Sequence, residues 1–245
     1  MIRNLILVTA AFAVVGCKTS PPTPPTGVLA QEGFEAFATP RSFDGPGTIY
    51  RIDEDGKRFS VSEIIIQFHT GDEELQNFIS TREISIGQLL QAIGVLAEEM
   101  PTSAKANVSS TASTTIEARS AKRHYVRDDD IEAAMLEWAA NARPRERNIY
   151  YLIRETVATN SLNYRVQRDW LASFSIDAEV LKSAGFEGEA KYTDASILEI
   201  ERLFDAERNV WYKAEKVTVS PSLGAAPGQY TVERIPVSGS AFGIE

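Results

Sequence analysis

The sequence is poor in the residues that most often build catalytic and metal sites. It has one cysteine and two histidines in 245 residues. A single cysteine forms no intramolecular disulfide and no thiolate cluster, so the fold must hold together through its core. Nucleophile-elbow, zinc-protease, phosphate-loop and dinucleotide-binding motifs are also missing from the sequence. We therefore expect no enzyme, no metal site and no cofactor.

Positive charge is scarce as well. The chain carries 25 Lys and Arg against 34 Asp and Glu, a net charge of −9. Nucleic-acid binding draws much of its affinity from cationic contacts with phosphate, so this balance argues against nucleic acid as a partner. Hydrophobic residues at 43% and charged residues at 24% are typical of a globular protein.

The apolar run near the N-terminus is too short to cross a bilayer. It extends over Leu5–Val15 behind the positive Arg3, whereas a membrane-spanning helix needs about 20 apolar residues. Its length and flanks are typical of a cleaved export signal. The residues that follow are Val14-Val15-Gly16-Cys17, and this stretch resembles the lipobox of bacterial lipoproteins.

The resemblance implies that residues 1–16 are a signal peptide, cleaved between Gly16 and Cys17. The thiol of Cys17 would then carry the lipid, with palmitate among its acyl chains, and residues 17–45 would be a proline-rich tether. Paired prolines in KTSPPTPPT favour an extended spacer. Lys18 after the cysteine points to the outer membrane. We therefore expect a lipid-anchored protein of the bacterial cell envelope, with the inner membrane and the cell surface as alternatives.

The rest of the chain predicts an α+β fold, mainly antiparallel β-sheet with two amphipathic helices in the N-terminal half. We expect a single domain over residues 46–220 and a loosely packed tail over 221–245. Asp55-Gly56 between two β-rich runs predicts a hairpin over 49–66. Apolar residues with helical spacing predict helices over 86–96 and 129–142, the first with a Ser85–Gln88 capping box.

Alternation of apolar and polar residues predicts further strands. Over residues 104–119 every charged side chain falls on one face, so we predict a long strand, with a disordered Ser/Thr linker as the alternative. Residues 173–180 and 186–193 also alternate around Gly185 and predict a hairpin within 172–194. Strands are also expected in the runs 149–153, 162–166 and 210–219, and a strand or short helix over 198–204.

Two groups of residues are weak candidates for chemistry. His69 lies beside Asp72 in FHTGDEE, where the pair could act in acid–base catalysis, although turn and capping roles suit them equally. His124 lies between a basic cluster and three acidic residues that suit a helix start. The cluster could contact a phosphate, but we expect a solvated loop whose charges neutralise one another; its members are Arg119, Lys122, Arg123 and Arg127.

These observations favour an envelope lipoprotein with a non-enzymatic binding or assembly role and an unidentified protein partner. Two alternatives stay open. One is a membrane-inserting or pore-forming protein that uses segments 104–119 and 172–194, although 104–119 lacks the apolar band and aromatic residues of lipid-facing strands. The other is a hydrolase that uses carboxylates or His69.

Overall fold

The computed structural model describes residues 33–52, 58–63, 66–71, 78–142, 149–222 and 229–237. Their eleven strands form one sheet in which every pairing is antiparallel. The described residues also form five α-helices. The predicted α+β class with a mainly antiparallel sheet is therefore confirmed.

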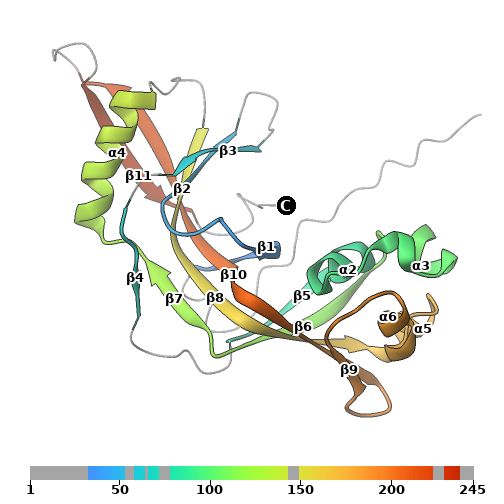
Figure 1. Ribbon diagram of the computed structural model, residues 1–245. Helices are drawn as coiled ribbons and strands as arrows, with labels where there is room; N and C mark the ends of the chain where they lie inside the picture. Colours follow the sequence, from blue (N-terminus) through green and yellow to red (C-terminus); the bar gives the residue numbers. More distant parts are fainter. Residues whose placement is uncertain are drawn as a thin grey trace, which may run out of the picture.

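Two long strands form the middle of the sheet (Figure 1). β8 (Ile149–Gln167) and β10 (Ile197–Pro221) pair along most of their lengths. Both are rich in the β-branched and aromatic residues that suit a pleated surface covered on both faces. The three sequence runs at 149–153, 162–166 and 210–219 thus belong to two continuous strands.

Shorter strands flank this pair. Along β8 lie β2 (Thr48–Ile52), β7 (Lys122–Tyr125) and β6 (Thr111–Arg119), and outside these lie β3 (Arg58–Glu63), β4 (His69–Thr70) and β5 (Phe78–Ser85). Along β10 lie β11 (Tyr230–Pro236), β1 (Glu35–Arg41) and β9 (Glu189–Tyr192). The β2–β3 pair confirms the predicted hairpin, whose Asp55-Gly56 turn lies outside the described residues.

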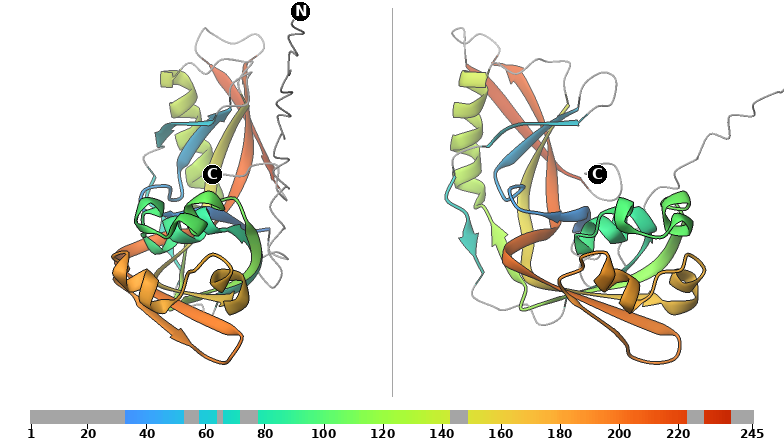
Figure 2. Two further views of the ribbon diagram at one scale, coloured as in Figure 1. Left: turned by 90° about the vertical axis from the view of Figure 1, so that its right-hand side faces the viewer. Right: turned by 45° about the vertical axis from the view of Figure 1, so that its right-hand side comes forward.

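The helices divide between the two ends of the sheet (Figure 2). α4 (Asp128–Ala142) covers one end, where Ile131, Met135 and Trp138 pack against Tyr150 and Leu152. The other end carries α2 (Ile86–Ile93), α3 (Thr102–Ala106), α5 (Arg168–Ala172) and α6 (Ala178–Ser183). We call these the α4 end and the helical end.

The β8–β10 ladder is irregular between the two ends. Leu203 pairs with Ser161 and Arg208 pairs with Thr159, so the four residues 204–207 of β10 face a single residue of β8. Two further register shifts follow, before Trp211 and before Ala214. Bulges of this kind bend and twist a strand locally, and they separate the ladder of the helical end from that of the α4 end.

Some details of the fold differ from the sequence-based expectations. The N-terminal half contains α3 as well as helices at the two predicted positions, so the prediction of two helices is not confirmed. α2 ends earlier than predicted, because Gly94 adopts the left-handed conformation that closes a helix (φ 80°). β1 lies within the range expected as tether and β11 within the range expected as tail, and both pair with β10.

Candidate functional site

Two antiparallel strand pairs lie side by side at the helical end. β5 pairs with β6, from Phe78 opposite Ala118 to Ser85 opposite Thr111. β6 pairs in turn with β8, and β8 with β10. The order β5-β6-β8-β10 is therefore two adjacent hairpins. We call residues 86–110, which join β5 to β6, the first connection, and residues 168–196, which join β8 to β10, the second connection.

Both connections leave the sheet at the same end. Thr115 on β6 lies opposite Arg165 on β8, so the start of β6 and the end of β8 are level with each other. β8 ends at Gln167, which lies opposite Ile197 at the start of β10. Figure 1 shows α2 and α3 next to α5 and α6 at this end of the sheet. The sheet thus presents two long helical connections side by side at one end.

The first connection is helical for clear local reasons. Ser85 and Gln88 form the predicted capping box, with hydrogen bonds of 3.1 Å and 2.9 Å between each side chain and the other residue's backbone N–H. The buried face of α2 presents Ile86, Leu89, Leu90 and Ile93 to the sheet. α3 follows directly after Pro101, which cannot continue a preceding helix but suits a helix start.

The second connection is held by caps and tight turns. Asp177 caps α6 by accepting a hydrogen bond of 2.8 Å from the backbone N–H of Val180. Leu181 is fully buried in the core of the helical end. Hydrogen bonds from the side chain and backbone of Ser196 lower the pKa of Asp194, whose carboxylate closes the turn between β9 and β10. β9 then folds back along the outer edge of β10.

The sequence pattern conflicts with the structure in these two connections. The strand predicted over 104–119 is present from Thr111 onward, but residues 104–106 belong to α3. The hairpin predicted within 172–194 is wrong, because residues 178–183 form α6 and β9 pairs with β10 instead. Capping by Asp177 and burial of Leu181 outweigh the alternation here, as tertiary context often does.

The two connections contact each other directly. Ser103 Oγ donates a hydrogen bond of 2.7 Å to the carbonyl oxygen of Phe174. Trp170 Nε1 donates one of 3.4 Å to Ser110 Oγ. Side chains from both connections also share one hydrophobic core with the sheet, including Leu90, Leu171, Ile176, Leu181, Phe186, Tyr164 and Ile200. The connections therefore form one packed layer.

Of the two candidate catalytic residues, the structure describes His69 alone. His69 Nε2 lies 3.8 Å from Asp130 Oδ2, and Asp72 lies outside the described residues. His124 Nδ1 shares a hydrogen bond of 3.0 Å with Thr70 Oγ1, and His124 Nε2 lies 3.4 Å from Glu207 Oε2. Lys122 holds the pKa of Glu207 below its usual value through a hydrogen bond of 2.6 Å, so this carboxylate is ionised and already paired with a cation.

The described residues form a cavity at the helical end, and it is not lined by these histidines. The cavity at the helical end, about 170 Å³ in volume, is lined by Arg168, Ser175, Tyr192 and their neighbours and by neither histidine. The described residues contain no group of three or more His, Cys, Asp or Glu side chains that could hold a metal ion. The hydrolase alternative stays a hypothesis without a geometric basis in the described part of the chain.

The basic cluster around His124 is paired with carboxylates of the sheet. Arg119 Nη1 lies 3.0 Å from Glu201, Lys122 contacts Glu207, and Arg123 Nε donates a hydrogen bond of 2.7 Å to Glu155. Glu201 and Glu207 lie on β10 and Glu155 on β8. These three cations are thus tied to the sheet.

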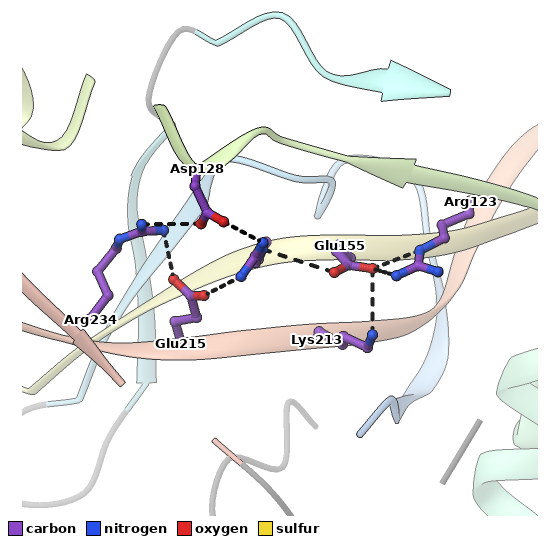
Figure 3. A network of polar contacts seen from close by, with 7 residues as sticks. Arg123, Asp128, Glu155, Lys213, Glu215 and Arg234 are labelled. Atoms are coloured by element: carbon purple, nitrogen blue, oxygen red, sulfur yellow. Dashed lines mark hydrogen bonds and ion pairs between the residues drawn. The ribbon is translucent and has the colours of Figure 1, made fainter. Parts of the chain in front are cut away.

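A larger ion-pair network joins β7, β8, β10, β11 and α4 (Figure 3). The buried Glu155 contacts Arg123 and Lys213, and the buried Glu215 accepts hydrogen bonds of 2.9–3.0 Å from Arg154 and Arg234. Asp128 at the start of α4 contacts the same two arginines. Because the buried carboxylates are paired, this network fixes β8, β10, β11 and α4 relative to one another.

Comparison with known proteins shows that the chain follows a path similar to that of a solved structure. No protein-family model matches the chain, and no curated protein is similar to it. Among solved structures it is similar to a bacterial gasdermin from Bradyrhizobium tropiciagri, with a TM-score of 0.49 and 13% sequence identity over 86% of this chain and 90% of that one. A similarity of this strength assigns no function, so the connections must be interpreted from their own geometry.

The N-terminal residues Gly16 and Cys17 lie outside the described residues. None of the described helices has the length and hydropathy needed to cross a membrane. Sequence patterns indicated the alternation over 104–119 and 172–194 but not the position of both connections at one end of adjacent hairpins, because that position depends on strand order.

Proposed function

We propose that this protein inserts into membranes by converting its two helical connections into the extended ends of two β-hairpins. The observation that carries the proposal is their placement: both connections lie at the same end of four consecutive antiparallel strands. Unwinding both would lengthen β5, β6, β8 and β10 in one direction, with no change in strand order. This proposal extends the alternative based on 104–119 and 172–194: the second segment lies within the second connection, whereas of the first segment residues 104–110 lie in the first connection and 111–119 form β6.

The connections are long enough for this change. The first contains 25 residues and the second 29. Divided between two arms, they supply about 12 and 14 residues per strand, whereas a tilted membrane-spanning strand needs about 9–11. Backbone groups in the bilayer would be satisfied by pairing between neighbouring strands, which lipid requires.

The alternation of the second connection suits such strands. Its even-numbered positions are largely apolar and include Trp170, Ala172, Phe174, Ile176, Ala178, Val180, Phe186 and Tyr192. Its odd-numbered positions are mostly polar or acidic. Strands in a membrane alternate in this way between a lipid-facing side and a water-facing side, and aromatic residues flank the apolar band. The aromatic residues that 104–119 lacks are therefore supplied by the second connection.

The conflict between pattern and structure supports the same interpretation. In most proteins local patterning agrees with the fold, and exceptions concentrate at functional sites. Here the period-two pattern fails in α3 and α6, one in each connection, and succeeds in the strands next to them. A sequence that must form both a helix and a strand would show this pattern.

A disulfide between β9 and β10 tests the proposal. Glu189 and Glu201 lie opposite each other in this strand pair, so a Glu189→Cys/Glu201→Cys double variant, made in a Cys17→Ser background, would fix β9 against β10. We expect the oxidised variant to release no dye from liposomes and the reduced variant to release it.

The matched control uses the same strand at the α4 end. Ser220 and Thr231 lie opposite each other in the β10–β11 pair, and we expect a Ser220→Cys/Thr231→Cys variant to release dye in both redox states. Equal dye release by the oxidised and reduced Glu189→Cys/Glu201→Cys variant would refute the proposal.

A lipid on Cys17, as the lipobox resemblance implies, would hold the domain at a membrane surface and so raise its local concentration there. Lipidation, the envelope location and a protein partner stay predictions from the sequence. They are compatible with insertion, because an anchored domain and an inserting domain need the same surface.

A further inference from the structure

The C-terminal end of α2 is capped by a side chain from another part of the chain. Gly94 ends the helix, and the amide groups of Gly94 and Val95 satisfy carbonyl groups of its last turn. The carbonyl oxygen of Ala92 accepts a hydrogen bond of 2.7 Å from Arg202 Nη1, which lies 110 residues further along the chain on β10. No residue in the last turn of α2 is basic. Arg202 therefore supplies the positive charge that a helix C-terminus favours.

Gly94 has no side chain, and this leaves room for the guanidinium of Arg202 at the end of α2. A Cβ atom on Gly94 would lie 2.6–2.7 Å from the guanidinium atoms of Arg202. The ring of Phe204 lies on the other side, with its centroid 4.8 Å from Arg202 Cζ, a cation–π distance. Arg202 is thus held between the end of α2 and an aromatic ring of its own strand.

Arg202 links the second hairpin, on which it lies, to the connection of the first hairpin. It lies on β10, five residues after that strand begins at Ile197, whereas Ala92 lies within the first connection. The contacts of Ser103 with Phe174 and of Trp170 with Ser110 join the same two parts of the chain. Because the connections also share one core, exposing one removes packing and hydrogen-bond partners from the other.

We propose that Arg202 helps to hold the first connection against the second hairpin, and that the two connections open together as one cooperative unit. The functional meaning of this coupling rests on the proposed membrane insertion. The coupling itself is a property of the folded protein in solution, where local opening occurs in contiguous cooperative units.

Amide hydrogen exchange on the full chain tests the coupling without a membrane. In Arg202→Ala we expect exchange to accelerate about tenfold over residues 86–93, since a hydrogen bond from a charged group is lost. We expect a similar acceleration over residues 168–183, which Arg202 does not cap. In Arg202→Lys, which keeps the charge but not the planar fork, we expect a smaller acceleration of the same two segments together.

Arg208→Ala is the matched control. Arg208 is on the same strand, and its Cζ lies 5.9 Å from the ring centroid of the same Phe204, but it is placed beyond the irregular residues 204–207. We expect amide exchange over both connections in Arg208→Ala to match that of the unmodified protein. Acceleration confined to 86–93 would show that Arg202 is only a local cap, and no acceleration would show that it holds nothing; either result overturns the proposal. If Arg202→Ala does not fold, the same comparison is made with Arg202→Lys.

Dye release from liposomes separates this proposal from the proposed function. We expect Arg202→Ala to release dye faster than the unmodified protein, and Arg208→Ala to match it. Coupled exchange without dye release from any variant would refute membrane insertion and leave the coupling intact. Dye release at equal rates from Arg202→Ala and the unmodified protein, with no change in exchange, would refute the role of Arg202 and leave membrane insertion intact.

Discussion

Tyr212 donates a hydrogen bond of 2.8 Å to Glu35 Oε2, and this contact joins β1 to β10 between the two ends of the sheet. Burial raises the pKa of Glu35 to about 7, although the bond from Tyr212 acts in the opposite direction. The folded state therefore holds a proton on Glu35 that the unfolded chain releases near its ordinary pKa of 4.5.

The first prediction concerns this proton. Between the unfolded and folded pKa values the native state binds more protons, so the contribution of Glu35 to stability decreases as the pH rises from about 4.5 to about 7. Glu35→Gln keeps an acceptor for Tyr212 and carries no charge. We expect it to be more stable than the unmodified protein at pH 8 and to lose this advantage at pH 5, as measured by urea unfolding.

The control for Glu35 is Glu98→Gln, which changes an exposed carboxylate on the short helical turn after α2. We expect the difference in unfolding free energy between this variant and the unmodified protein to stay constant from pH 5 to pH 8. A Glu35→Gln advantage that is equally large at both pH values would contradict the assignment.

The second prediction tests which side of the second connection would face lipid. Ala172 and Ser173 are adjacent and exposed in the present fold, at the end of α5. After insertion, Ala172 would lie on the apolar side and Ser173 on the polar side. A lysine in contact with lipid costs about 2–4 kcal/mol at the bilayer midplane, so we expect Ala172→Lys to reduce dye release strongly and Ser173→Lys to reduce it little.

Both lysine variants should unfold at urea concentrations close to that of the unmodified protein, because a cation near a helix C-terminus is tolerated. Equal loss of dye release in the two variants would argue against the assigned sides of the strand.

The third prediction concerns the α4 end. Met135 lies on α4 and is fully buried, whereas the neighbouring Leu136 is 40% exposed. Met135→Ala should lower the free energy of unfolding by about 2–5 kcal/mol through lost burial and the cavity left behind. Leu136→Ala should lower it by less than about 1 kcal/mol. If the two variants lose the same stability in urea, the packing of α4 on the sheet is not as described.

The fourth prediction concerns the cysteine near the N-terminus. If Cys17 carries the lipid that its lipobox resemblance implies, Cys17→Ser should abolish incorporation of labelled palmitate in bacteria and release the protein from the membrane fraction. Cys17→Ser in a protein that still takes up the label would eliminate the lipoprotein interpretation. Ser20→Ala, three residues further into the tether, serves as the control that should change neither result.

Local patterns predicted the elements whose stability is local. The helix at 128–142 was visible because one of its faces is buried against the sheet. The alternation over 111–119 and 162–166 was visible because the apolar side chains of these strands point into the core. The helices of the second connection were not, because a cap at Asp177 and a buried Leu181 decide their form against the alternation around them.

Contacts between distant residues could not be predicted from the sequence. Arg202 and Ala92 are 110 residues apart, and nothing near either residue indicates the other. The same holds for Glu35, which lies in a range that read as tether, while its partner Tyr212 lies in an ordinary strand pattern. Strand order, which places both connections at one end, is equally a property of the whole chain.

The irregular residues 204–207 allow one part of the sheet to stay unchanged while the helical end rearranges. Because they interrupt the β8–β10 ladder, the pairing of β10 with β1 and β11 can keep its register while the strands on the other side of the interruption lengthen. The α4 end would then be an unchanging reference body. A fluorophore on β11 should report the same surroundings before and after liposome binding, whereas one on β9 should report an entirely new environment.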